Sequence, residues 1–380
     1  MKWRCVIFQI AVAFVLLGLF GCDRDDSRKQ EVRIGALLAL TGNEATFGQW
    51  SKEGIELATD DVNRAGGINS SRLSVVYEDS RSDPKTALSG LRKLIDVNKV
   101  PVIIGETTSA GTLACAPEAE KAKVVLITPT AGSPDIANAG DYIFRTRESG
   151  EAQAEAFARY VRNTLELTRV AILYPKAANA EGYRKAFVPT FESAGGQIVA
   201  DEGFAPDAID LSAQLTKIRN SNPEAVYVPG TAAQVARALK QGRELGVKAQ
   251  FLSSAAAEAP ELLDIAGTAT EGLIYASFAF DPKSGSNQVS TFVSAYQNRY
   301  GKLPTPWAAN AYDAVRLVAE AIKKVGTDST KIKDFLYGVK NYPGVSGTIS
   351  FDAKGEAQKP VSVKKVEDGQ FKFVTLITNP

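Results

Sequence analysis

The sequence predicts an α/β protein with two doubly wound lobes, each built on a parallel sheet. Strand-length apolar runs alternate with segments of helical period along most of the chain. Runs such as 101–105 and 124–127 are almost wholly apolar, as in strands that helices cover on both faces. After loss of an N-terminal signal, 359 of the 380 residues remain, which is more than one hydrophobic core commonly holds.

The first 22 residues are typical of an export signal. Lys2 and Arg4 precede an apolar run at 6–20 that is short for a membrane span. The run leads into Leu-Phe-Gly-Cys, which resembles a bacterial lipobox, so cleavage would leave Cys22 as a lipid-bearing N-terminus. Ordinary secretion with an unmodified Cys22 is the alternative. We expect a lipid anchor at the outer face of the cytoplasmic membrane, in the periplasm of a Gram-negative cell, where Asp23 resembles a retention signal.

Beyond the signal, the elements alternate regularly. Residues 23–30 are charged and without apolar period, which indicates a solvated tether. A strand at 32–40 leads through a turn-rich loop into a helix that a Gly-Gly pair ends. The apolar stripe of this helix consists of Trp50, Gly54, Leu57, Ala58 and Val62. Further strands, each followed by a helical pattern, are expected near 72–79, 101–105, 124–128, 169–174, 198–204, 225–229 and 250–254.

The C-terminal part departs from this alternation. Two long helices are predicted near 287–300 and 308–325, the second with an apolar stripe along one side. Three strands linked by short glycine-containing turns follow at 348–351, 361–366 and 371–377.

Composition excludes several classes of function. The chain has no histidine, so it has no Ser-His-Asp or Cys-His machinery and no zinc site of the usual kind. Removal of the signal changes the net charge from +1 to −1, which leaves no strong field to attract nucleic acid. The first strand-helix loop, at 41–48, lacks the GxGxxG spacing of a dinucleotide site. We expect no enzymatic activity, no metal and no cofactor.

Cysteine usage is equally restrictive. Cys5 leaves with the signal and Cys22 carries the lipid, so Cys115 has no partner for an intramolecular disulfide. Its apolar neighbours indicate a small core residue rather than a reactive thiol.

Six phrases occur in a fixed order along the mature chain. They are Ala39-Leu40-Thr41-Gly42 with Phe47-Gly48, Asp60 to Ile68, Val102-Ile103-Ile104-Gly105 with Ser109, Ile127-Thr128-Pro129, Tyr142 to Thr146, and Ala311-Tyr312-Asp313-Ala314. Together they resemble the periplasmic binding proteins of branched-chain amino acid transporters, the leucine/isoleucine/valine-binding family. The likeness covers essentially the whole mature chain.

This resemblance implies a type I periplasmic binding fold, with two lobes joined by three crossings and a ligand held between them. Lobe I would comprise 31–148 plus 281–345, and lobe II would comprise 149–280 plus 346–380. It also implies a monomer that closes around a small ligand and delivers it to the permease and ATPase subunits of an ABC importer. We expect the ligand to be an amino acid or a related carboxylate or amide.

Ligand contacts are expected where the parallel strands end. Loops and helix N-termini at that edge present free amides that attract an acid group. By resemblance, the first lobe contributes Phe47, Thr108, Ser109, Thr130, Ala131, Gly132 and Ser133. Gly132 stands where the family commonly has Thr, and the hydroxyl of Ser133 could replace the missing one. Ser109 could instead be only an N-cap, and the loop at 130–133 only a turn.

Departures from the family's pattern gather in the second lobe. Asn179 and Thr231 stand where the family has aromatic residues, and Ala255 stands where it has the acid that neutralises a ligand ammonium. An unpaired ammonium in a closed cleft is costly. Either Glu258 or Glu106 substitutes, or the ligand is not an ordinary α-amino acid. The replacements favour a roomier or more polar pocket, suited to an aromatic acid, an amide or another carboxylate.

Two other functions are compatible with parts of the sequence. A ligand-sensing subunit for a kinase or receptor needs the same closing cleft, and neighbouring genes would distinguish it from an importer subunit. A carboxylate-based hydrolase would need facing acids. Asp60-Asp61 lies on a helix and Asp25-Asp26 lies in the tether, so neither pair fits that geometry.

Overall fold

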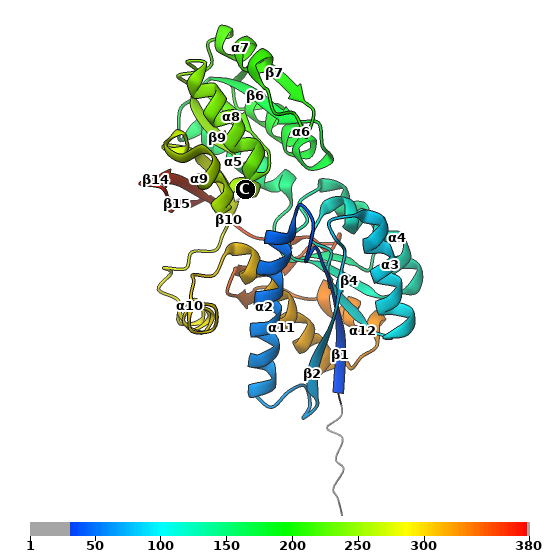
Figure 1. The fold of residues 1–380 in the computed structure, drawn as a ribbon. Coiled ribbons are helices and arrows are strands. Elements are labelled where there is room, and N and C mark those ends of the chain that lie inside the picture. Colours follow the sequence, from blue (N-terminus) through cyan, green and yellow to red (C-terminus); the bar gives the residue numbers. More distant parts are fainter. Residues whose placement is uncertain (1–30, 378–380) are drawn as a thin grey trace, which may run out of the picture.

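Two lobes, each a sheet flanked by helices, make up the computed structural model, which describes residues 31–377 (Figure 1). The strands of the first sheet are β1 (Glu31–Leu38), β2 (Arg72–Asp79), β3 (Val102–Gly105), β4 (Val125–Thr128) and β5 (Ile143–Arg145). Their order is β2-β1-β3-β4-β5, and all neighbours are parallel. Strands β3 and β4 are buried along their whole length, as their apolar runs predict.

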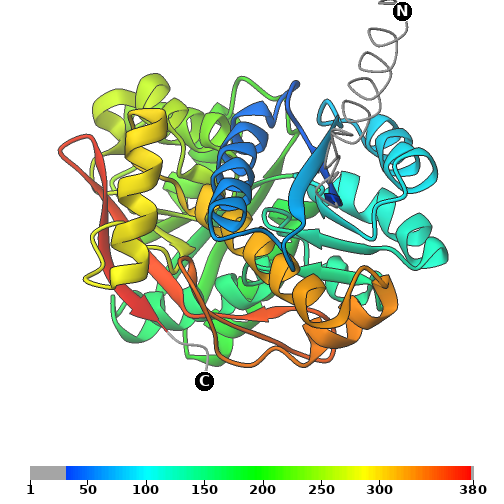
Figure 2. The same cartoon turned by 90° about the horizontal axis from the view of Figure 1, so that it is seen from below.

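Helices cover both faces of this sheet (Figure 2). They are α2 (Ala45–Arg64), α3 (Pro84–Arg92), α4 (Ser109–Ala122), α10 (Asn287–Tyr300), α11 (Pro306–Val325) and α12 (Ser329–Tyr337). Ile34 and Leu38 pack with α2 and α11, whereas Leu37 packs with α3 and α4, because successive strand side chains point to opposite faces. Helices α2 and α11 approach closely at Gly54, where a Cβ would lie 2.1 Å from the Ala308 carbonyl oxygen.

The second lobe holds a larger, mixed sheet. Its strands are β6 (Arg169–Pro175), β7 (Gln197–Phe204), β8 (Ala225–Val228), β9 (Gln250–Ser253), β10 (Ile274–Phe278), β14 (Val361–Glu367) and β15 (Gln370–Ile377). Their order is β15-β14-β10-β9-β8-β6-β7; β14 is antiparallel to both of its neighbours and the other pairs are parallel. Its helices are α5 (Gly150–Asn163), α6 (Ala178–Ser193), α7 (Ser212–Asn220), α8 (Ala232–Glu244) and α9 (Pro260–Ala266).

The chain crosses between the lobes three times, as predicted. The crossings follow β5, follow β10, and join β13 (Ala357–Gln358) to β14. The first and third lie side by side, since Arg145 pairs with Glu356 in a β-bridge and its amide donates to the Gly355 carbonyl at 2.9 Å.

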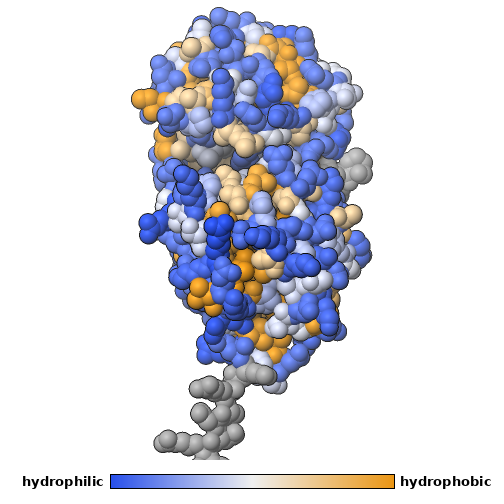
Figure 3. Space-filling view, turned by 90° about the vertical axis from the view of Figure 1, so that its right-hand side faces the viewer, coloured by the Kyte–Doolittle hydropathy of each residue, from blue (hydrophilic) through white to orange (hydrophobic). Residues whose placement is uncertain are grey.

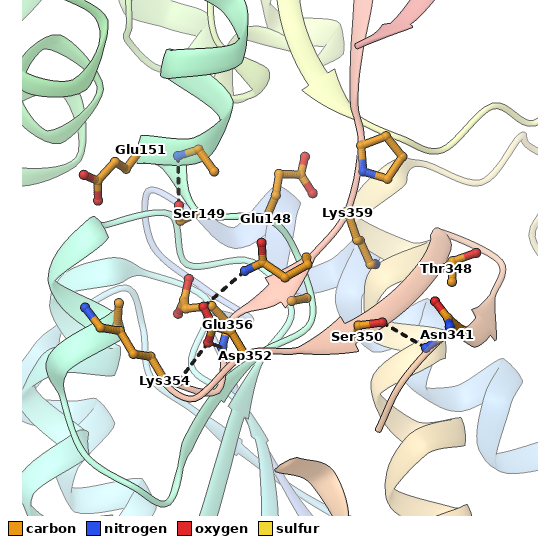
Figure 4. A pocket seen from close by; sticks show the side chains of 15 residues that line it. Glu148, Ser149, Glu151, Asn341, Thr348, Ser350, Asp352, Lys354, Glu356 and Lys359 are labelled. Atoms are coloured by element: carbon orange, nitrogen blue, oxygen red, sulfur yellow. Dashed lines mark hydrogen bonds between the residues drawn. The ribbon is translucent and has the colours of Figure 1, made fainter. Parts of the chain in front are cut away.

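Buried charges hold these crossings together. The Arg145 guanidinium is fully buried and forms an ion pair with Glu356, with Nε 2.9 Å from Oε2. Lys359 Nζ donates to Ser346 Oγ at 2.6 Å, and the Ser346 hydroxyl in turn donates to Asp313. We call Arg145, Asp313, Glu356 and Lys359 the crossing cluster. A cavity of about 480 Å³ lies beside it, with Glu356 and Lys359 among its lining residues (Figure 4).

Most predicted elements are confirmed, and the differences are local. Strands β5 and β10 and the short β11 (Tyr342–Gly344) and β13 are additional to the predicted set. The strand at 124–128 was expected to precede a helix, but a single 3₁₀ segment, Pro134–Asn138, follows it. Pro134 lies at the start of that segment, and the chain then enters β5 at once. The predicted core roles of Trp50 and Cys115 are confirmed, since both side chains are buried.

Packing changes one of the expected lobe boundaries. Ile349 and Phe351, on β12 (Gly347–Phe351), belong to the apolar core of the first lobe, and the Phe351 ring contacts Phe144. We therefore propose that 346–360 goes with lobe I rather than lobe II.

Several expectations fall outside the described residues. The export signal, the lipid-bearing Cys22, Asp23, the tether and Asp25-Asp26 all precede residue 31. Within 31–377, no helix combines the length and apolar character needed to span a membrane. On the side of the molecule that carries α3 and α4, hydrophilic residues predominate, with smaller apolar groups between them (Figure 3).

Candidate functional site

A cavity of about 220 Å³ lies between the lobes, where strands of both sheets end. Thr107 follows β3, Thr130 follows β4, Ala177 follows β6 and Thr231 follows β8, and all four line the cavity. Arg147, on the first crossing, also lines it. Ligands of open parallel sheets bind at this edge, so the location matches the predicted one.

Eight of the ten predicted ligand-binding residues line this cavity. They are Phe47, Thr108, Ser109, Thr130, Ala131, Gly132, Asn179 and Thr231. Ser133 does not line it: its side chain is buried, and its Oγ accepts the Asp135 amide at 3.3 Å. The Ala255 amide faces Gln153 Oε1 at 3.4 Å, and the neighbouring Ala256 lines the cavity instead.

The N-terminus of α4 forms the first-lobe wall of the site. Thr108 is its N-cap, because its Oγ1 accepts the Gly111 amide at 2.9 Å, so the interpretation of Ser109 as the N-cap is wrong. Ser109 Oγ accepts the amides of Gly132 at 3.1 Å and Ser133 at 3.0 Å. Its own O–H therefore remains to donate to a ligand. The amides of Ser109 and Ala110, as first-turn groups, have no intrahelical acceptor.

The loop at 130–133 offers fewer free amides than expected. The Ala131 amide donates to Thr128 Oγ1 at 3.0 Å, and the Gly132 amide is bonded to Ser109. Both amides are therefore already bonded inside the lobe, although both residues line the cavity. The donors toward the cavity come from α4 instead.

Neither acid named as a substitute for the missing carboxylate reaches the cavity. Glu258 forms an ion pair with Lys364 at 2.6 Å. Glu106 accepts Ser80 Oγ at 2.6 Å and the Thr108 amide at 2.8 Å, and burial raises its pKa. Both carboxyl groups serve the interior of their own lobe.

Nine further lining residues were not predicted from the sequence; five are small, namely Thr107, Ala110, Ala177, Ala178 and Ala256, and four have larger side chains. The four are Glu44, which directly precedes α2, Arg147, which directly follows the Tyr142–Thr146 phrase, Tyr183, one turn beyond Asn179, and Trp307, the second residue of α11. The charged run after an apolar strand could have singled out Arg147. No sequence motif around Trp307 predicts a place in the cleft, because this residue lies far along the chain from the first-lobe loops that line it.

Glu44 is the acid that does line the cavity. It precedes α2 at the N-cap position and is partly buried. Burial, and then the neighbouring charges of Glu106 and Glu261, raise its pKa to about 7. Near neutral pH it is therefore divided between the neutral and the charged form.

Arg147 lies at the junction of the two lobes, 2% exposed. Its Nη1 donates to the Thr130 carbonyl at 3.1 Å and its Nη2 to Tyr183 Oη at 3.2 Å. The guanidinium lies 4.4 Å from the Phe278 ring centre and 5.9 Å from that of Trp307, within the range of cation–π attraction.

Two buried polar atoms of the lining have no hydrogen-bond partner among the described residues. They are Asn179 Oδ1 and Trp307 Nε1. Buried groups of this kind are normally satisfied, so an acceptor beside Trp307 and a donor beside Asn179 would complete the site. The arrangement can hold a small, polar, acid-bearing molecule.

Comparisons with known proteins agree with the fold. A family model described as a periplasmic binding protein matches residues 31–370. The leucine-, isoleucine-, valine-, threonine-, and alanine-binding protein of Pseudomonas aeruginosa is 27% identical over 353 residues, covering 92% of this chain and 93% of that protein. The crystal structure of the leucine binding protein LivK from Thermotoga maritima has a TM-score of 0.86 at 32% identity, covering 91% of this chain and 99% of that one. The isoleucine complex of LivJ from Streptococcus pneumoniae has a TM-score of 0.84 at 29% identity, with coverage of 91% and 99%.

These matches extend over nearly all of the described residues and over both lobes. They confirm the predicted resemblance to leucine/isoleucine/valine-binding proteins and the type I periplasmic binding fold. The chain belongs to the periplasmic binding protein family of substrate-binding proteins.

Proposed function

We propose that this protein is the extracytoplasmic solute-binding subunit of an ABC importer, that it acts as a monomer, and that it is held at the membrane by lipid on Cys22. Its ligand is a small molecule related to an amino acid, either an amino acid itself or a carboxylate or amide of similar size. Permease and ATPase subunits are its partners.

The observation that carries the proposal is the position of the cavity. First-lobe residues such as Ser109, second-lobe residues such as Asn179 and the crossing residue Arg147 line the same small space. A ligand that contacts both lobes binds the closed state better than the open one and so shifts the population toward closure. The three crossings provide the hinges for that motion.

The test combines binding with a measurement of shape. Protein expressed from the full-length sequence, purified in mild detergent, is screened by thermal shift against amino acids, aromatic acids and amides. A binding compound should raise the melting temperature and reduce the radius of gyration in X-ray scattering. Failure of every compound to bind a folded sample contradicts the proposal.

The anchor and the partners need separate measurements. Mass spectrometry of the mature N-terminus should detect acyl chains on Cys22, and Cys22→Ala should release the protein from membranes. Co-purification with a permease supports import, whereas co-purification with a sensor kinase supports the sensing role.

A further inference from the structure

One buried cation among the described residues, Arg147, forms no ion pair. Among the described residues, the cationic side chains less than a tenth exposed are those of Arg145, Arg147, Lys359 and Lys364. Arg145 and Lys364 form ion pairs with carboxylates, and Lys359 is linked to Asp313 through the Ser346 hydroxyl. Arg147 forms no ion pair with a carboxylate of the described residues, and its three hydrogen-bond partners are neutral oxygens.

Glu148, the next residue, does not fill this role. Arg147 Nε donates to the Glu148 backbone carbonyl at 2.8 Å, not to its carboxyl group. The side chain of Glu148 instead lines the separate cavity beside the crossing cluster (Figure 4). Burial raises the pKa of Glu148, and the neighbouring charges of Arg147 and Lys359 oppose that rise. Glu148 therefore interacts with Arg147 through space, but its carboxyl group makes no hydrogen bond to the guanidinium and leaves the cleft-side donors free.

The unused donors of Arg147 have room on the cleft side. A guanidinium has five N–H groups, and three of them are bonded within the protein. Gly132 lies beside one of the two nitrogens that carry the other N–H groups: a Cβ there would lie 3.2 Å from Nη1 and 3.3 Å from Asn179 Oδ1. A side chain at position 132 would therefore crowd both groups, and glycine avoids this.

Other free donors line the same cavity. The Trp307 side chain is 5% exposed, and its buried indole N–H has no acceptor among the described residues. The hydroxyl of Ser109 and the first-turn amides of Ser109 and Ala110 add to these donors. A site with this balance of donors and an unpaired cation stabilises an anion.

Acceptors for an ammonium are few in this cavity. Its lining holds one carboxyl group, that of Glu44 just before α2, and burial and neighbouring carboxylates keep this group partly neutral near pH 7. The Thr130 carbonyl already accepts from Arg147, and Ala255 supplies no carboxylate at the place where the resemblance expects one. An ammonium bound beside the guanidinium would also meet a like charge. The orphan Oδ1 of Asn179 can instead accept from a neutral donor, such as a hydroxyl.

We propose that this cavity selects carboxylates that carry no ammonium group, with Arg147 as the partner of the ligand's negative charge. The inference rests on the proposed function and narrows its ligand class from amino acids and their relatives to acids without an amine. The carboxylate of the ligand forms the ion pair that Arg147 does not form within the protein.

The test compares ligands of one carbon skeleton with and without a carboxylate or an ammonium group. Binding of 4-methylpentanoate, leucine and leucinamide to the full-length protein in detergent is measured by calorimetry, with benzoate and benzamide as a second set. 4-Methylpentanoate should bind about tenfold or more tightly than leucine and leucinamide, and benzoate should bind about tenfold or more tightly than benzamide. This difference is the effect of one charge-assisted hydrogen bond. Tighter binding of leucine than of 4-methylpentanoate overturns the inference and leaves solute binding intact. No binding of any compound overturns both.

Variants separate a ligand contact from a structural brace between the lobes. Arg147→Gln should weaken binding of the acids about 10- to 100-fold while leaving amide binding unchanged, and Arg147→Lys should retain part of the affinity. Arg184→Gln, on α6 but outside the cavity lining, is the matched control, and circular dichroism verifies folding. Equal weakening of acids and amides by Arg147→Gln means a merely structural role and overturns the inference.

Discussion

Two arginines, Arg145 and Arg147, lie two residues apart on the same crossing but have different kinds of partner. Both are buried, but Arg145 forms an ion pair with Glu356, whereas Arg147 donates to neutral oxygens. Arg145 belongs to the crossing cluster and serves the fold, while Arg147 faces the cleft. The difference teaches that the pairing of a buried charge helps to distinguish structural from ligand-binding cations in this protein.

The two side chains nevertheless share one task. Arg145 Nη1 donates to the Ser133 carbonyl at 2.8 Å, and Arg147 Nη1 donates to the Thr130 carbonyl at 3.1 Å. They therefore hold the 130–133 loop from both ends. Movement of either guanidinium would move the loop that lines the cleft.

The largest expected effect is on stability at the paired arginine. Arg145→Met leaves the Glu356 carboxylate buried without its cation and should lower the free energy of unfolding by about 3–5 kcal/mol. Urea denaturation measures it. The double variant Arg145→Met with Glu356→Leu should recover most of the loss, since both charges are then gone. A loss below about 1 kcal/mol would show that Glu356 is not the main partner of Arg145.

A smaller effect is expected at the glycine that makes room for the unpaired arginine. Gly132→Ala places a Cβ 3.2 Å from Arg147 Nη1, so the guanidinium must shift. Affinity for the tightest-binding carboxylate should fall about tenfold, which is about 1.4 kcal/mol in calorimetry. Gly285→Ala, at a site with no atom within 4 Å of the added Cβ, is the control. Unchanged affinity would mean that Arg147 does not touch the ligand.

Glu44 is expected to make the free energy of unfolding depend on pH by about 1 kcal/mol. The pKa of Glu44 is raised to about 7 in the folded protein, so its neutral form favours the fold and this stabilisation is lost as pH rises through 7. At pH 8, Glu44→Gln should raise the free energy of unfolding by about 1 kcal/mol, a value reduced for partial exposure. Below the ordinary pKa of 4.5 the variant and the wild type should agree.

The check is urea denaturation of both proteins at several pH values between 4 and 8. Thr46→Ser, an exposed change in the first turn of α2, should leave the pH dependence as it is. A constant difference between Glu44→Gln and wild type across this range would contradict the raised pKa.

The smallest expected effect is on stability at the unpaired arginine. Arg147→Met without ligand should change the free energy of unfolding by less than about 1 kcal/mol, because lost bonds to neutral groups are offset by removal of a desolvated charge. Thermal and urea denaturation alongside Arg145→Met give the comparison directly. Losses of similar size at both arginines would remove the distinction drawn between them.

The sequence predicted the sheets well where strands are continuous apolar runs, as in β3 and β4. It missed β5, which has only three residues, and β10, in which Ser277 interrupts the apolar pattern. Both strands form because they pair with neighbouring strands of their sheet, and a local sequence pattern does not reveal such pairing.

The site was predictable where it follows strand ends and less so elsewhere. The α4 N-terminus and the 130–132 loop were located from β3 and β4. Arg147 lies on a crossing and Trp307 on a helix far along the chain, so their approach to the cleft depends on how the lobes pack. The bonded state of the Ala131 and Gly132 amides likewise depends on side chains from other segments.

The β-bridge between Arg145 and Glu356 limits how the two halves of the molecule can swing apart. Because it joins the first and third crossings, these two segments cannot bend independently. We therefore expect the lobes to rotate about an axis close to that bridge, with the segment after β10 as the third connection. Arg147 lies only two residues from this axis, where a given rotation displaces atoms least. The charge that meets the guest would thus stay nearly stationary while the outer rims of the cleft travel farthest.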